Sequence, residues 1–105
     1  MTQTDIQNQM RAYLGENLPA YLALLRQMVE INSFTANAAG VNQLGELTAV
    51  AFQSLGFTAV FVPSANPNFG RHLVLRKPGK SAKQIGLVSH LDTVFPPDEE
   101  IRHNF

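Results

Sequence analysis

The residue pattern changes character at Gly56, and this change limits the folds open to a chain of 105 residues. Before Gly56, apolar residues recur at the three-to-four-residue spacing of amphipathic helices. After it, apolar residues come in short runs rich in β-branched and aromatic side chains, which are typical of strands. Glycine is also common just past the end of a helix. The pattern predicts an α/β fold in which two helices precede three strands.

Two helix-breaking residues, Gly15 and Pro19, interrupt the first helical pattern. Residues 5–14 are expected to form a helix within an N-terminal extension over 1–17, capped by Thr4 or Asp5. Residues 19–30 are predicted as a separate, strongly amphipathic helix, because proline is tolerated in the first turn.

A second amphipathic helix is predicted over residues 40–55, after a small and polar loop over 32–39. Strands are predicted over 57–62, 71–76 and 84–89. The first two are expected to pair through the turn-rich loop between them. The third is almost continuously apolar, as in strands buried on both faces of a sheet, so it is expected to be central.

Composition excludes several functional classes. Hydrophobic residues make up 45% of the chain and charged residues 15%, which argues against a disordered tail. Eight basic and eight acidic residues leave no overall field for nucleic acid or an anionic membrane. The absence of cysteine excludes thiol nucleophiles and cysteine-based zinc sites. No apolar run could span a bilayer and the N-terminus lacks a signal-peptide core, so a cytoplasmic location is expected.

The candidate site follows the third predicted strand, at the strand's carboxyl end, where open α/β sheets bind ligands. His90 and Asp92 stand there two residues apart, so on an extended chain they share a face. This suits a metal-binding imidazole whose other nitrogen donates to a carboxylate. A structural histidine satisfied by a nearby carboxylate fits the same spacing. His72 is expected on a strand surface, and His103 in the terminal loop without a partner.

The sequence GLVSHLDTVFPP, residues 86–97, closely resembles the metal-ligand segment of a family of dinuclear zinc metallopeptidases. That family includes glutamate carboxypeptidase, acetylornithine deacetylase and succinyl-diaminopimelate desuccinylase. Its pattern is an apolar strand, a small residue, His-x-Asp, Thr and Val. Residues 21–33 and 40–57 are similar to the family's first two helices and the start of its first strand. The resemblance therefore runs from about Leu18 to the end of the chain.

The resemblance implies a role for each residue of the pair. His90 would be a zinc ligand, and Asp92 the catalytic-site carboxylate that orients its ring. In the family, two zinc ions activate a water molecule that hydrolyses a C-terminal peptide bond or an N-acyl amino acid amide. A small peptide or an N-acyl amino acid would be the substrate, with no nucleic-acid or membrane partner.

The family's remaining metal ligands and its general base lie downstream of the His-x-Asp segment. Residues 1–105 are therefore expected to be the truncated N-terminal part of a catalytic domain, inactive alone, whose parent can form a homodimer. The alternative is a non-catalytic small α/β module that binds a partner through an exposed sheet edge. A purely structural domain is a third interpretation. Coding sequence that continues into further family motifs would favour the enzyme.

Overall fold

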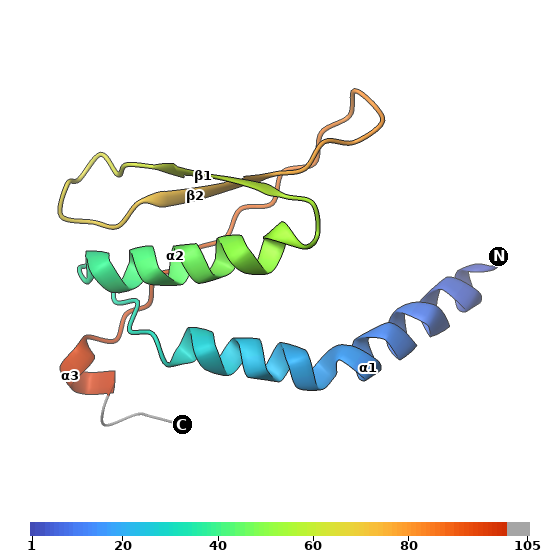
Figure 1. The fold of residues 1–105 in the computed structure, drawn as a ribbon, viewed down its shortest axis with the longest axis horizontal. Helices are drawn as coiled ribbons and strands as arrows, with labels where there is room; N and C mark the ends of the chain where they lie inside the picture. Colours follow the sequence, from blue (N-terminus) through green and yellow to red (C-terminus); the bar gives the residue numbers. More distant parts are fainter. Residues whose placement is uncertain (101–105) are drawn as a thin grey trace. The chain divides into compact units, whose positions relative to one another are not determined.

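The computed structural model describes residues 1–100, so His103 lies outside the described residues. The elements are α1 (Gln3–Val29), α2 (Ala38–Gln53), β1 (Thr58–Val62), β2 (His72–Arg76) and α3 (Pro97–Glu100) (Figure 1). The chain divides into two compact units, Met1–Glu30 and Ile31–Phe105. Helices and an antiparallel strand pair together are consistent with the predicted α/β class.

The first unit is one continuous helix, so the prediction of separate helices over 5–14 and 19–30 is wrong. Pro19 lies inside α1 and removes one backbone donor, which costs a single hydrogen bond to the residue four positions earlier. That residue is Gly15, around which the space is open. The helix therefore accommodates the proline with a bend, which is visible in Figure 1. No helix within residues 1–100 is long and apolar enough to cross a membrane.

The helix begins earlier than predicted because Thr2 caps it, in place of Thr4 or Asp5. The Thr2 hydroxyl accepts from the Asp5 backbone N–H at 3.1 Å. In return, the Asp5 carboxylate accepts from the Thr2 backbone N–H at 2.9 Å. This reciprocal capping box satisfies N–H groups that a helix N-terminus otherwise leaves without partners.

The second unit is built from α2 and a β-hairpin. Strands β1 and β2 pair antiparallel, with Phe61 opposite Leu73, which confirms the predicted pairing. The burial of β1 alternates along the strand, and α2 packs against the hairpin around the buried Leu44. At Gly45 an added Cβ would lie 3.3 Å from the Phe61 ring, so helix and strand approach closely there. Gly56 adopts a φ of 88° just past the helix, as its position predicted.

The predicted third strand does not form. Ile85, Leu87 and Val88 are 91%, 94% and 100% exposed. Across residues 1–100, no backbone hydrogen bond joins 84–89 to another segment. An apolar run becomes a strand only when a neighbouring strand satisfies its N–H and C=O groups, and within residues 1–100 no segment pairs with 84–89. The prediction of a buried central strand is therefore wrong for this part of the chain.

Candidate functional site

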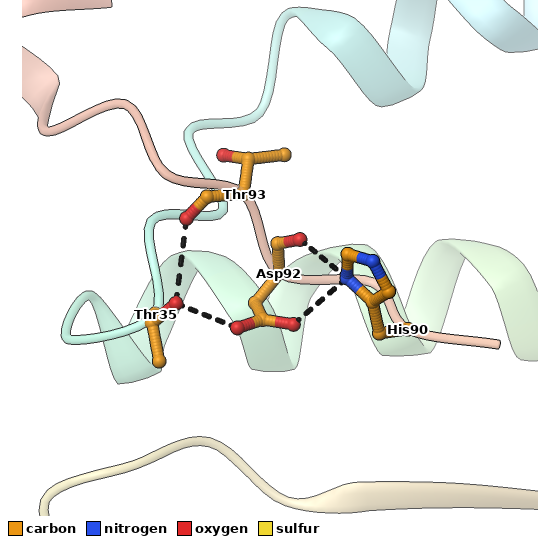
Figure 2. A network of polar contacts seen from close by, with 4 residues as sticks. All are labelled: Thr35, His90, Asp92 and Thr93. Carbon is orange, nitrogen blue, oxygen red and sulfur yellow. Dashed lines mark hydrogen bonds and ion pairs between the residues drawn. The ribbon is translucent and has the colours of Figure 1, made fainter.

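His90 and Asp92 lie close together, as their spacing predicted. The Nδ1 atom of His90 is 2.9 Å from the backbone oxygen of Asp92 and 3.2 Å from its Oδ1 (Figure 2). Both partners are acceptors, so Nδ1 carries a hydrogen and donates it. A neutral imidazole in this tautomer presents its lone pair at Nε2, the nitrogen that faces away from Asp92.

The carboxylate of Asp92 has a second partner. Its Oδ2 accepts a hydrogen bond from the hydroxyl of Thr35 at 2.6 Å, while Oδ1 faces His90 (Figure 2). The Thr35 hydrogen bond holds the pKa of Asp92 below its ordinary value. Partial burial opposes this effect, and the His90 contact adds a smaller lowering. Asp92 is therefore an ionised acceptor at neutral pH, with a donor on each oxygen.

Backbone contacts bring Thr35 to Asp92 across 57 positions of sequence. The segment around Phe34 forms a parallel bridge with Thr93. The Thr93 N–H donates to the Ser33 oxygen at 2.8 Å, and the Thr35 N–H donates to the Thr93 oxygen at 3.2 Å. Reasoning from the sequence missed this contact, because the polar run over 32–39 predicts a loop but not the segment that the loop pairs with.

Asparagine side chains hold the loop before α2. Asn37 accepts from the Gly40 N–H at 3.2 Å and donates to the Asn32 backbone oxygen at 3.2 Å. Asn32 in turn donates to the Phe95 backbone oxygen at 3.1 Å. Ser33 is buried within the loop. Together with the Thr35–Asp92 bond, the Asn32–Phe95 bond ties the loop to the chain on both sides of Thr93, so the position of Thr35 is set by several hydrogen bonds.

The residues present fit one part of a metal site. The His90 side chain is 82% exposed and the Asp92 side chain 36%, so the imidazole is accessible. Zinc sites take three or four protein ligands. Within residues 1–100, no group of three or more His, Cys, Asp or Glu side chains could hold a metal ion. His72 and Asp98 are exposed elsewhere and do not join the pair.

No family model and no solved structure matches the chain. Carboxypeptidase G2 of Pseudomonas sp. (strain RS-16) is 32% identical to it over 77 residues, which cover 73% of the chain. The same residues cover 19% of that protein, so the chain spans about a fifth of the length of the curated relative it matches. The chain is thus similar to part of a carboxypeptidase.

Proposed function

We propose that the protein to which these residues belong is a zinc-dependent peptidase. It would hydrolyse a C-terminal peptide bond or an N-acyl amino acid amide, as a carboxypeptidase does. The observation that carries the proposal is the His90–Asp92 pair, in which Nδ1 is held by the aspartate and Nε2 faces away from it. The similarity to Carboxypeptidase G2 supports the same reaction class.

Each residue of the pair has a distinct role in this proposal. His90 would bind zinc through Nε2. Asp92 would keep the hydrogen on Nδ1, orient the ring and raise the basicity of its other nitrogen. Bound zinc supplies a water of lowered pKa and polarises the carbonyl that is attacked. The remaining ligands and the general base would come from outside the described residues.

The exposure of His90 favours this role over a structural one. A histidine that serves only packing gains from burial, but this side chain is 82% exposed. Its carboxylate partner nevertheless has a donor on each oxygen. An ordered, hydrogen-bonded imidazole directed to solvent is suited to binding something outside this part of the chain.

The test is substitution in the complete protein, with zinc content and turnover as the measurements. His90→Ala should remove most activity, because a ligand is lost. Asp92→Asn should keep the metal and lower the rate by about 10- to 100-fold, the usual effect of removing such an orienting group. His72→Ala, at an exposed position in β2, is the matched control and should behave as wild type. Normal turnover and full zinc content in His90→Ala would refute the proposal.

A non-catalytic interaction module is the second candidate, favoured by the exposed segment 84–89. Its side chains are mostly apolar and its backbone pairs with no other segment of residues 1–100, so it could receive a strand from a partner chain. In that case the complete protein would lack zinc and turnover. Val88→Lys would weaken partner binding, whereas His90→Ala would leave it intact.

A further inference from the structure

Thr35 makes the shortest hydrogen bond of the candidate site. Its hydroxyl lies 2.6 Å from Asp92 Oδ2, compared with 3.2 Å from His90 Nδ1 to Asp92 Oδ1. The same hydroxyl lies 3.4 Å from the backbone oxygen of Thr93. A hydroxyl has one hydrogen to give, so the shorter contact with the carboxylate receives it. Bonds of this length to an ionised acceptor are among the stronger ones in proteins.

We propose that Thr35 is a positioning residue, which holds the Asp92 carboxylate so that Oδ1 faces His90 Nδ1 and Nε2 stays free. The inference rests on the proposed function, since it assigns to Thr35 the control of a metal-binding imidazole. Thr35 would act through Asp92 and touch neither metal nor substrate.

The Asp92 carboxylate needs a second hydrogen-bond partner to keep one orientation. Rotation about the last side-chain bond of aspartate is only weakly restricted, so its two oxygens exchange readily. Asp92 is 36% exposed, and water competes for both oxygens. A donor fixed on Oδ2 leaves Oδ1 directed at the ring, as Figure 2 shows. Without that donor the carboxylate can turn to solvent, and His90 keeps only the backbone oxygen of Asp92 as a local acceptor.

The effect of the Thr35 hydroxyl can be tested separately from the backbone structure around it. The bridge between the two segments is made by backbone atoms, with hydrogen bonds from Thr93 to Ser33 and from Thr35 to Thr93. Thr35→Val keeps the branched shape and those backbone bonds but removes the donor to Asp92. Thr35→Ser restores a hydroxyl on a smaller side chain. A purely structural role would respond to shape, whereas a positioning role should respond to the hydroxyl.

The control is a second threonine in the same unit. The Thr48 hydroxyl donates to the Leu44 backbone oxygen at 2.8 Å within α2. Thr48→Val therefore makes the same chemical change at a part-buried site whose hydroxyl bonds within α2, away from the hydrogen bonds of His90 and Asp92.

The experiment is nitrogen NMR of the His90 imidazole in the 105-residue chain, at a pH where the ring is neutral. The shifts of Nδ1 and Nε2 report which nitrogen carries the hydrogen. Wild type, Thr35→Ser and Thr48→Val should favour the Nδ1–H tautomer. Thr35→Val should lower the ratio of Nδ1–H to Nε2–H by roughly two- to tenfold, the range expected for one lost hydrogen bond. An unchanged ratio in Thr35→Val, together with a changed one in Asp92→Asn, would overturn the proposal.

Hydrogen exchange at the Thr93 amide shows whether the bridge survives each substitution. If Thr35→Val loses that protection, Thr35→Ala is used instead, and its ratio of Nδ1–H to Nε2–H tests the role of the hydroxyl in the same way. In the complete protein, Thr35→Val should lower kcat about tenfold with little change in KM, and Thr35→Ser should restore it. The two proposals fail separately, because the NMR measurement needs no turnover. If the tautomer ratio depends on the Thr35 hydroxyl but the complete protein has no hydrolytic activity, the role of Thr35 stands and the proposed function is refuted.

Discussion

Gly40 occupies a position in α2 that has no room for a side chain. A Cβ added there would lie 1.8 Å from the backbone oxygen of Asn32 and 2.8 Å from Asn37 Nδ2. Contacts below 3.0 Å are essentially never seen for real Cβ atoms, and the nearer neighbour is backbone. The backbone of Gly40 has no positive φ, so the obstacle to Gly40→Ala is steric. The loop that carries Thr35 would have to move by more than 1 Å to bring the 1.8 Å contact to 3.0 Å.

The expected destabilisation combines three effects. Overpacking against a backbone atom costs about 1–3 kcal/mol. Displacing Asn37 weakens the N-cap of α2, which costs about 1 kcal/mol. The higher helix propensity of alanine compared with glycine offsets about 1 kcal/mol of this destabilisation. Gly40→Ala should therefore destabilise α2 by about 1–3 kcal/mol. Gly15→Ala is the matched control, since nothing lies within 4 Å of the added Cβ and only the favourable propensity remains.

Amide hydrogen exchange followed by NMR measures both changes in the same chain. In Gly40→Ala, the protection of amides around the buried Leu44 should fall by roughly 5- to 150-fold, the equivalent of 1–3 kcal/mol. In Gly15→Ala, protection within α1 should rise. Unchanged protection in α2, or the same direction of change in both variants, would show that the packing argument at Gly40 is wrong.

Three further outcomes are expected. As pH falls below about 4, α1 should lose helicity measured by circular dichroism. The hydrogen bond from the Thr2 backbone N–H lowers the pKa of Asp5, so the stabilisation that the ionised carboxylate gives the helix is lost when Asp5 is protonated; Asp5→Asn should flatten this pH dependence. Residues 1–105 should bind zinc more weakly than micromolar in equilibrium dialysis and hydrolyse neither C-terminal peptide bonds nor N-acyl amino acid amides, since ligands beyond His90 are needed; stoichiometric tight binding would contradict this. The exposed apolar segment 84–89 should make the chain self-associate in sedimentation; Val88→Lys should reduce this association because it adds a charge to the segment, whereas Gln84→Ala should not.

Features set by neighbouring residues could be predicted from the sequence. The hairpin of β1 and β2 follows from two alternating runs separated by a short turn-rich loop. Gly56 lies three residues after the end of α2 and has a φ of 88°, a left-handed conformation that suits few other residues. The proximity of His90 and Asp92 is also local, because residues two apart on extended chain share a side.

Features that depend on distant partners could not be predicted in the same way. The apolar pattern over 84–89 predicted a buried central strand, but composition does not say whether a neighbouring strand is present to pair with it, and the segment is exposed. At Pro19, the sequence marked a helix breaker, yet the loss of one hydrogen bond beside Gly15 was small enough for α1 to continue. The contact of Thr35 with Asp92 depends on chain folding over 57 positions, which periodicity does not record.

The candidate site combines a local contact with contacts from a distant part of the sequence. A His-x-Asp pair can form on any extended segment, because its contact needs only local geometry, so the pair alone is weakly specific. What distinguishes this pair is the loop before α2, which supplies a donor to the other oxygen of Asp92 and a backbone bridge to Thr93. Fixing a side chain costs entropy, and the hydrogen bonds of the loop offset that cost before any ligand arrives. If His90 binds zinc as proposed, the loop would hold its imidazole in place before the metal arrives, and substitutions that loosen the loop should lower metal affinity.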